Sequence, residues 1–330
     1  MATLNLKIDP LGNWSKTILS RYPFPPYWWI DDMTLKSRQS LLGLELDRAQ
    51  SKKRACLTGY VSREGEMLGF SQAARLAWDT CHFGCEIWQL EHMGAWGGLP
   101  GREAVAGALI RETIRVAGEM GCRCIQARIP VDNLVAIHAL ERAGFKAMEV
   151  HSTWVFDLLK WEMPRKRNPQ MIRDFRPSDA GALIQLARSS YNRIPDRFHM
   201  DPHFPEDASN ELYAQWIRNS CSGELADFIA VAESEGRIIA YATLRDFGDY
   251  DGLSNVRIAQ FGLGAVHPDF RNRGLVSDLV IHNMERLNRR HGRFSLIATQ
   301  GNNIPAQRLF LNAGFKPATT ALTLHYWEGD

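Results

Sequence analysis

The feature that most restricts the fold of this 330-residue chain is an internal repeat. A pattern of Asn-x-x-Ala, an apolar residue and Ala-Gly-Phe-Lys spans Asn133–Lys146 and returns at Asn303–Lys316, 170 positions further on. A repeat of this length indicates two copies of one domain, because solenoid repeats have periods of roughly 20–50 residues. The chain is long enough for two domains that each bury their own core. We therefore expect similar orders of helices and strands in the two halves.

The composition is that of an ordinary globular chain, and it argues against several classes of function. Charged residues make up 23% of the sequence and the formal net charge is +2. This balance gives neither a basic stripe nor an acidic tail, so no nucleic-acid partner is expected. Because no long apolar run occurs and Met1–Trp14 lacks a basic segment ahead of an apolar one, we expect no membrane span and no signal peptide. The expected location is the cytoplasm.

The cysteines do not form a metal-binding pattern. Their spacings match no common zinc motif, although Cys81 lies near Cys85 and Cys122 lies near Cys124. Cys122 and Cys124 would share one face of a strand. We expect buried free thiols in a cytoplasmic protein and no metal. The six residues are Cys56, Cys81, Cys85, Cys122, Cys124 and Cys221.

The stretch Gln260–Val276 of the second copy combines a strand, a basic glycine-containing loop and the start of a helix. Gly262 and Gly264 interrupt the strand pattern, which is typical of a bulge or a close backbone approach. The first N–H groups of a helix have no partner within the helix and lie at its positive dipole end. Gly274 allows a phosphate to approach, and the two arginines beside it, Arg271 and Arg273, add positive charge. The sequence therefore predicts an anion site here.

Together with the Asn-x-x-Ala…Gly-Phe pattern, this stretch resembles the GNAT superfamily of N-acetyltransferases. The resemblance implies an α/β fold with two tandem GNAT-like domains, each a mixed, mostly antiparallel twisted sheet flanked by helices. It also implies that acetyl-CoA is the acyl donor and that an Arg-x-x-Gly-x-Gly/Ala loop holds its pyrophosphate. Here that loop reads Arg271, Gly274 and Val276, so valine replaces the final small residue. This change removes no backbone donor.

The resemblance places the acetyl-CoA site along this stretch. The edge of the strand would pair with the pantetheine amides, and the backbone N–H groups at the bulge, Leu263 and Gly264, would stabilise the oxyanion. Asn303 is either a helix N-cap, a pantetheine contact or both. The expected acetyl-CoA contacts are Gly264, Ala265, Val266, Arg271, Asn272, Arg273, Gly274, Leu275, Val276, Asn303 and Phe310.

One position departs from the family pattern. Family members usually carry a tyrosine in the helix after Asn-x-x-Ala, where it protonates the departing CoA thiolate. This chain has Phe310 there, and the first copy has Leu140. Phenylalanine has no proton to donate, so water or another group acts as the acid, or this copy is not catalytic. General acid–base catalysis contributes typically about 10²–10⁴-fold, so its loss need not abolish turnover.

Two further segments resemble the dTDP-fucosamine acetyltransferase family. The first is Leu76–Gly84, and the second runs from Arg197 to Ile217. The resemblance implies acetyl transfer to the amino group of a nucleotide-linked deoxyamino sugar, with Arg197, Phe198 and Tyr213 on the substrate side. Two alternatives remain, namely a GNAT enzyme for another amine or peptide and a non-catalytic acyl-CoA-binding protein. The sequence leaves an oligomer possible.

The general base stays unassigned. Two histidines, His199 and His203, lie in the substrate loop, and Asp246, Asp249 and Asp251 follow the strand before the bulge. The imidazole or carboxylate of each of these residues could accept a proton from the amine. A plain exposed loop residue is the more conservative interpretation of every one of them.

We expect a degenerate GNAT-like domain over residues 1–160, a linker over 161–170 and an acyltransferase domain over 171–330. The first copy opens its helix at Gly97–Arg102 without the basic lead-in of the second. The basic run Arg165–Arg167 in the linker is expected to be solvated. Tyr22–Trp29 is expected to be a surface loop whose aromatic rings pack on the core.

Hydrophobic periodicity sets the expected elements. Short strands are expected over 57–90, and Asp132 is expected to cap a helix. Other strands are expected at 123–129, 171–173, 228–232 and 237–245, with helices at 100–121, 132–143, 180–190, 208–220 and 275–291.

Overall fold

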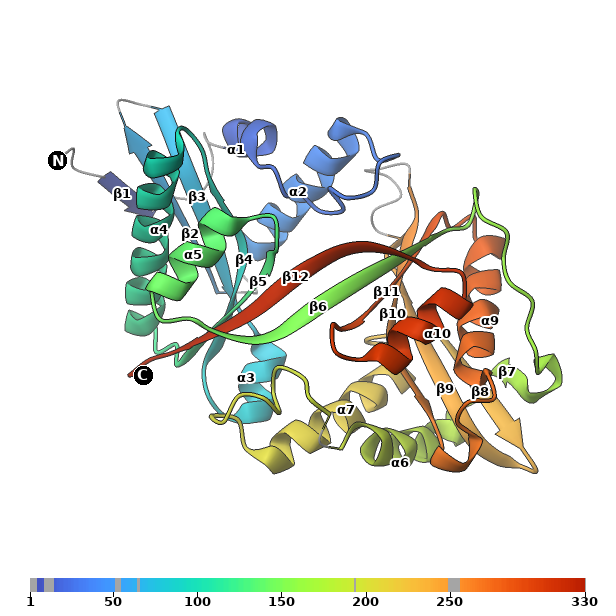
Figure 1. Ribbon diagram of the computed structural model, residues 1–330. Helices are drawn as coiled ribbons and strands as arrows, with labels where there is room; N and C mark the ends of the chain where they lie inside the picture. The colour runs from blue at the N-terminus through green and yellow to red at the C-terminus, as the bar shows by residue number, and fades with distance from the viewer. Residues whose placement is uncertain are drawn as a thin grey trace. The chain divides into compact units, whose positions relative to one another are not determined.

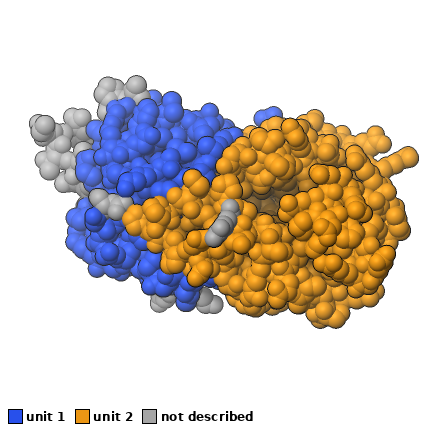
Figure 2. Space-filling view, turned by 60° about the horizontal axis from the view of Figure 1, so that its bottom comes forward, with its two compact units in different colours: residues 1–150, 320–330 blue, residues 151–319 orange. Residues whose placement is uncertain are grey.

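The computed structural model describes residues 5–8, 15–50, 55–63, 66–192, 194–248 and 256–329. The chain folds into two compact units, each built around a mixed β-sheet (Figures 1 and 2). Unit 1 comprises residues 1–150 and 320–330, and unit 2 comprises residues 151–319.

Unit 1 has the sheet order β1-β2-β3-β4-β5-β12. The β4–β5 pair is parallel, and the other neighbouring pairs are antiparallel. Helix α4 packs on β2, β3 and β4, and α5 packs against α4. The elements are β1 Asn5–Ile8, α1 Ser15–Arg21, α2 Leu35–Gln50, β2 Cys56–Arg63, β3 Glu66–Arg75, α3 Ala77–Phe83, β4 Ile87–Ala95, α4 Leu99–Glu119, β5 Cys124–Pro130 and α5 Leu134–Arg142.

Unit 2 has the order β6-β11-β10-β9-β8-β7. Again one pair, β10–β11, is parallel and the others are antiparallel. Helix α9 packs on β8, β9 and β10, and α6 packs on β9 and β10. From residue 146 onward the elements are β6 Lys146–Asp157, β7 Ile172–Asp174, α6 Ala180–Tyr191, α7 Glu206–Cys221, β8 Phe228–Ser234, β9 Arg237–Asp246, β10 Ile258–Val266, α9 Leu275–Arg289, β11 Phe294–Gln300, α10 Ile304–Asn312 and β12 Lys316–Trp327. Residues 146–150 of β6 and 320–327 of β12 belong to unit 1.

The last strand of each repeat completes the sheet of the other unit. Strand β12 pairs with β5 of unit 1 from Trp327↔Cys124 to Ala321↔Pro130. Strand β6 pairs with β11 of unit 2 from Asp157↔Phe294 to His151↔Gln300. The two registers begin at equivalent positions of the repeat, because Trp327 and Asp157 are 170 residues apart, as are Phe294 and Cys124. The exchange is therefore symmetrical.

The apolar stripe predicted for the helix after the glycine loop is confirmed in α9. Leu279, Met284 and Leu287 have no exposed surface, and Leu275 and Val280 are almost as buried. They form one hydrophobic core with residues of β9 and β10 and with Ala313 and Phe315, which precede β12. This packing fixes the N-terminal end of α9 next to the end of β10, which is where the candidate site lies.

The predicted fold class is confirmed, but several local expectations differ from the structure. Helix α3, at Ala77–Phe83, lies where only strands were expected. Helix α5 is capped by Asn133, whose side chain accepts from the Ala136 N–H, so the Asp132 cap is wrong. Of the six cysteines, only Cys122 and Cys124 are buried, so the expectation of buried thiols holds for these two.

The compact units also differ from the domain boundaries expected from the sequence. Residues 151–160 belong to unit 2, and residues 320–330 belong to unit 1. Within the predicted linker, Arg165 and Arg167 are exposed as expected, whereas Lys166 is partly buried and forms a 2.6 Å ion pair with Glu285 of α9. The aromatic segment after α1 packs as expected, with Tyr22 against Phe70 at 5.2 Å between ring centroids.

Candidate active site

The centre of the candidate site is a bulge in β10. The register with β9 shifts between Phe261 and Gly264, which gives β10 one extra residue there. The Leu263 N–H donates to the Thr243 hydroxyl at 2.8 Å, so a side chain replaces the missing ladder bond. A Cβ on Gly262 would lie 2.9 Å from that same hydroxyl, which explains the glycine. The predicted bulge is therefore present, although the Leu263 N–H is already satisfied.

Beyond the bulge, β10 separates from its parallel neighbour. Their register pairs are confined to Ile258–Gln260, and Gly264 is exposed. The backbone of Gly264 is hydrogen-bonded by the tyrosine at the end of α6, Tyr191. The Tyr191 hydroxyl accepts from the Gly264 N–H at 3.1 Å and donates to the Gly264 carbonyl at 2.7 Å. The strand edge thus presents a donor and an acceptor at one residue, which is the pattern that an amide of a ligand would match. The surface of unit 2 is hollowed in the view of Figure 2.

The loop from β10 to α9 has the geometry of an anion cradle. A 3₁₀ turn at Pro268–Phe270 is followed by positive φ angles at Asn272 (61°) and Gly274 (77°). Gly274 is the N-cap residue of α9, and no side chain caps that helix end. The unpaired N–H groups and the positive helix dipole at this end favour an anion. The guanidinium of Arg273 lies 4.8 Å above the Phe270 ring, which orients it beside the loop.

A buried aspartate in the first turn of α9 holds the predicted linker against this loop. Asp278 accepts from the Arg167 N–H at 2.9 Å, from the Asn168 N–H at 2.9 Å and from the Asn168 side-chain amide at 2.9 Å. The Arg167 side chain consequently lies 3.3 Å from the position that a Cβ on Gly274 would take. Arg167 therefore brings a further positive charge to the helix end, a role that the sequence analysis did not assign to it.

The residues after β11 have the expected positions. Asn303 caps α10, because its side chain accepts from the Ala306 N–H at 3.3 Å and donates to the Thr299 hydroxyl at 3.0 Å. Phe310 is 5% exposed and packs edge-on against Trp154, with 5.9 Å between ring centroids. The cap is confirmed, whereas a contact of Asn303 or Phe310 with acetyl-CoA stays a prediction.

The residues predicted on the substrate side form a buried hub around Asp196. The Asp196 carboxylate accepts from the Tyr213 hydroxyl and, at 2.8 Å, from the Phe198 N–H. Burial, and then the Asp196 charge, raises the pKa of Tyr213 well above its usual value. The Tyr213 ring also stacks on Tyr191 at 4.4 Å between centroids. The guanidinium carbon of Arg197 lies 4.2 Å from the centroid of the Phe198 ring. Of the three predicted residues, Arg197 and Phe198 therefore lie in the loop before α7, and Tyr213 lies in α7 itself.

Three of the five candidate bases are engaged in polar contacts. His199 contacts Asp196 through Nδ1 and Asn210 through Nε2, both at 3.0 Å. His203 contacts Asp201 at 2.9 Å, and Asp246 pairs with Arg257 at 2.7 Å. Because the side chains of His199 and Asp246 are 7% and 4% exposed, the expectation of exposed loop residues is wrong for both. The other two candidates, Asp249 and Asp251, lie outside the described residues.

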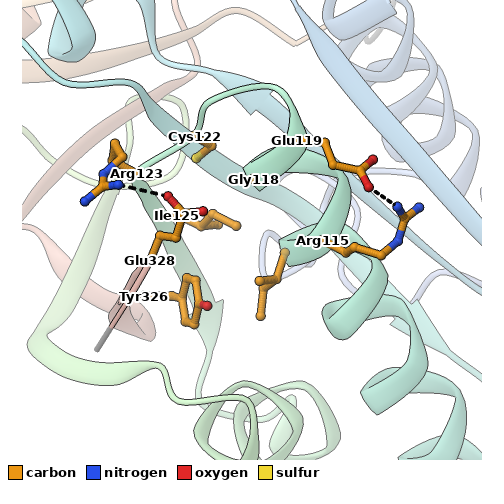
Figure 3. Close-up of a pocket in the computed structure, with 9 residues that line it drawn as sticks. Arg115, Gly118, Glu119, Cys122, Arg123, Ile125, Tyr326 and Glu328 are labelled. Carbon is orange, nitrogen blue, oxygen red and sulfur yellow. Dashed lines mark hydrogen bonds and ion pairs between the residues drawn. The ribbon is translucent and has the colours of Figure 1, made fainter.

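A separate hollow of about 370 Å³ lies in unit 1, beside the C-terminal end of α4 (Figure 3). The charges around it pair with one another, since Arg115 contacts Glu119 and Arg123 contacts Glu328 at 3.1 Å. Because these side chains are paired with one another, they offer no unpaired charge that would attract a charged ligand. We therefore assign the hollow no function.

The part of the chain with described coordinates holds no group of three metal-ligating side chains. Across the same residues, none of the helices combines the length and the apolar character required to cross a bilayer.

The strand bulge, the split between β10 and β11, and the glycine-capped helix together form the candidate site of unit 2. The Acetyltransferase (GNAT) family matches residues 185–315, so this part of the chain is a GNAT acetyltransferase domain and the protein is an acyltransferase. Among curated proteins, it is similar to the spore coat polysaccharide biosynthesis protein SpsD of Bacillus subtilis. Their identity is 29% over 210 residues, which cover 62% of this chain and 67% of that protein.

Two other similarities agree with this class. The chain is 26% identical to the dTDP-fucosamine acetyltransferase of Escherichia coli over 204 residues, which cover 62% of this chain and 80% of the enzyme. A tandem GNAT protein from the clavulanic acid biosynthesis pathway shares the fold, with a TM-score of 0.59 at 14% identity and 99% coverage of both chains. The tandem arrangement predicted from the repeat therefore has a structural counterpart over the whole chain.

Sequence reasoning missed four residues of this site, namely Tyr191, Thr243, Asp278 and Arg167. A weak signal existed for the first of them, since Tyr22 and Tyr191 lie 169 positions apart, one short of the repeat offset of 170. Asp278 is an acidic residue in the first turn of an otherwise apolar helix start, where the helix dipole favours a carboxylate. No comparable signal marked Thr243 or Arg167, because only the fold brings them to β10 and α9.

Proposed function

We propose that this protein transfers the acetyl group of acetyl-CoA to the amino group of a nucleotide-linked deoxyamino sugar. The observation that carries the proposal is the pairing of two features in unit 2. One is the open edge of β10 at Gly264, and the other is the glycine-capped start of α9 with its basic residues. The edge suits the pantetheine amides, and the helix end suits the pyrophosphate.

The residues present fit such a donor. Gly274 takes a positive φ at the start of α9, where no side chain caps the helix, and a side chain at this position would meet Arg167. Arg271, Arg273 and Arg167 supply positive charge, and Val276 contacts the strand rather than closing the loop. Its Cγ1 would lie 3.5 Å from a Cβ on Gly264, an ordinary packing distance. The replacement of the usual small residue by valine is thus accommodated.

The reaction that this geometry suits is direct attack by the neutral amine on the thioester carbonyl. The new C–N bond pushes an electron pair onto the carbonyl oxygen, and the Gly264 N–H, once released from the Tyr191 hydroxyl, would stabilise that charge. Collapse of the intermediate breaks the C–S bond, and the amine proton passes to water. The acceptor is proposed from the curated similarities, because SpsD and dTDP-fucosamine acetyltransferase are both named for sugar chemistry.

The test is a thiol-release assay with acetyl-CoA and a panel of acceptors. The panel contains dTDP- and UDP-linked amino sugars, the free amino sugars, amino acids, a lysine peptide and a polyamine. We expect CoA release with a nucleotide-linked amino sugar and little with the free sugar. Release with a simple amine alone would replace the acceptor by the alternative, an acyltransferase for another small amine. Absence of release with every nucleotide sugar, by a protein that binds acetyl-CoA, would contradict the proposed acceptor.

A further inference from the structure

The residue that contacts the open strand edge of unit 2 is Tyr191, which has no part in the attack and collapse steps proposed above. Its hydroxyl is within hydrogen-bond distance of both backbone groups of Gly264. A ligand oxygen that accepts the Gly264 N–H would replace the hydroxyl as acceptor and lie next to it. The ring can stay in place, because rotation of the hydroxyl hydrogen about the C–O bond is enough for the O–H to donate to the same oxygen.

We propose that Tyr191 is a catalytic residue whose hydroxyl, together with the Gly264 N–H, donates to the thioester carbonyl oxygen and to the oxyanion formed from it. The inference rests on the proposed acetyl transfer and adds a side-chain donor to it. Tyr191 keeps its proton throughout, so the balance of the reaction is unchanged. The electron pair of the C–S bond leaves on sulfur, and the amine proton passes to water.

The ring of Tyr191 is held in place for this role. It stacks on Tyr213 with an angle of 9° between the ring planes. Tyr213 is in turn fixed by its hydrogen bond to Asp196, whose side chain is buried. A donor whose position is fixed before the reaction loses little free energy through reorganisation when charge develops.

The protonation state also suits a donor. Burial raises the pKa of Tyr191 to about 12, and the hydrogen bond with the Gly264 backbone acts against that shift. The phenol therefore stays protonated through the neutral and mildly basic range. Hydrogen bonds to a charged group are worth more than neutral ones, so this donor favours the oxyanion over the uncharged carbonyl.

Two neighbouring side chains cannot take over this function. Phe310, at the position where the family carries a tyrosine, has no hydroxyl. The Thr243 hydroxyl already accepts from the Leu263 N–H and donates to the Leu263 carbonyl. Tyr191 is the hydroxyl that the structure places on Gly264 itself.

Unit 1 contains an equivalent contact that serves as a natural control. Tyr22 follows α1 as Tyr191 ends α6, and it hydrogen-bonds the backbone of Met93, the β4 counterpart of Gly264. Its ring is buried against Phe70 and His92. The contact therefore belongs to the fold of both repeats, and only in unit 2 does it face an exposed strand edge.

The experiment compares Tyr191→Phe with Tyr22→Phe in the full chain. We expect kcat of Tyr191→Phe to fall by roughly 10²–10³-fold, the loss typical of one oxyanion donor, with a far smaller change in the Kd for acetyl-CoA. We also expect the infrared carbonyl band of bound ¹³C-labelled acetyl-CoA to move to higher frequency, because a hydrogen bond to the carbonyl is lost. Tyr22→Phe should leave both measurements unchanged.

The infrared readout needs no acceptor, so it separates this inference from the identity of the sugar. If Tyr191→Phe keeps both the band and kcat, or if Tyr22→Phe lowers kcat equally, the inference is wrong while the proposed function stands. If the wild type does not bind acetyl-CoA, both fall together. Should Tyr191→Phe fail to fold, 3-fluorotyrosine at position 191 is the second variant. As a stronger donor it should lower the band frequency, and an unchanged band would overturn the inference.

Discussion

Unit 1 and unit 2 share a fold, yet only unit 2 keeps the strand split open. Both strands before the split, β4 and β10, carry a bulge, since the register of β4 with β3 also shifts by one residue. Beyond it, the unit 1 residue that corresponds to Gly264 is Met93, which is 2% exposed, and a Cβ on the neighbouring Gly94 would lie 3.0 Å from the Tyr22 ring. At the equivalent edge of unit 2, Gly264 is exposed. Aromatic packing has therefore filled in unit 1 the space that unit 2 leaves for a ligand.

The connections that follow the two strands differ in the same way. In unit 1, β4 ends at Ala95 and α4 starts at Leu99, after a short connection with no basic residue. In unit 2, the longer segment His267–Gly274 carries Arg271 and Arg273. The N-cap residues of α5 and α10 also differ in their hydrogen bonds. The Asn133 side-chain amide donates to the Met93 carbonyl at 3.4 Å, whereas the Asn303 amide donates to the Thr299 hydroxyl at 3.0 Å. A bulge and an asparagine cap occur in both units and belong to the fold, whereas the basic loop and the open edge are confined to the candidate site of unit 2. We therefore propose that unit 1 is degenerate with respect to acetyl-CoA.

The largest expected effect comes from separating the units at the exchanged strand. Deletion of residues 320–330 removes the part of β12 that pairs with β5, and should expose the apolar edge of unit 1 even though the deletion lies at the other end of the chain. Limited proteolysis with mass spectrometry should show new cleavage sites within residues 56–145. A chain that stops after Trp327 keeps β12 and is the control. Cleavage confined to residues 171–319 would contradict the exchange.

The two helix N-caps offer the next test of the comparison. Gly274→Asp places a carboxylate where phosphate should bind, and we expect the Kd for acetyl-CoA to rise at least roughly tenfold, or about 1.4 kcal/mol. Gly98→Asp at the N-cap of α4 should have no effect, since Gly98 has an ordinary φ of −66° and no atom within 4 Å of a built Cβ. Gly274→Asn, which tolerates the positive φ, separates charge from strain. Calorimetry that finds equal affinities for the Asp variant and wild type would reject the phosphate site.

A smaller effect should follow from Arg167. Because its side chain lies at Gly274 and is exposed, Arg167→Gln should weaken acetyl-CoA binding by roughly two- to fivefold at low salt, the range of about 0.5–1 kcal/mol for exposed charges. The difference should shrink as salt rises. Arg165→Gln, two residues away on the same segment, is the control and should bind as the wild type does. Equal weakening in both variants would indicate a general charge effect instead.

The smallest expected effect is that of Phe310→Tyr. The ring volume is nearly conserved, and Tyr191 already supplies a hydroxyl in our proposal, so turnover should be unchanged or slightly higher at low pH. Steady-state kinetics at several pH values provide the measurement, with the melting temperature as a check on folding. Abolished activity in a folded variant would show that Phe310 does not lie where we expect it. The equivalent residue of unit 1, Leu140, is fully buried in the core, so changes there should act on stability alone.

Several properties of this protein follow from its sequence without tertiary information. The repeated Asn-x-x-Ala…Ala-Gly-Phe-Lys pattern predicts two similar units, and the alternation of Gly262 and Gly264 with apolar residues predicts the β10 bulge. The stripe from Leu275 to Leu287 predicts the buried face of α9. These features depend on neighbouring residues, because capping, turn formation and periodic burial are decided within a few positions of the chain.

Other properties were decided only by the tertiary structure. Each copy carries a last strand of similar pattern, so the sequence does not specify that β6 joins β11 and β12 joins β5. The same holds for Arg167 beside Gly274, which are held together by Asp278 across 111 residues of sequence. It also holds for Tyr191 on Gly264, a contact across 73 residues. Contacts of such long range depend on how complete elements pack, and this packing determines which of two similar halves keeps a strand edge open for a ligand.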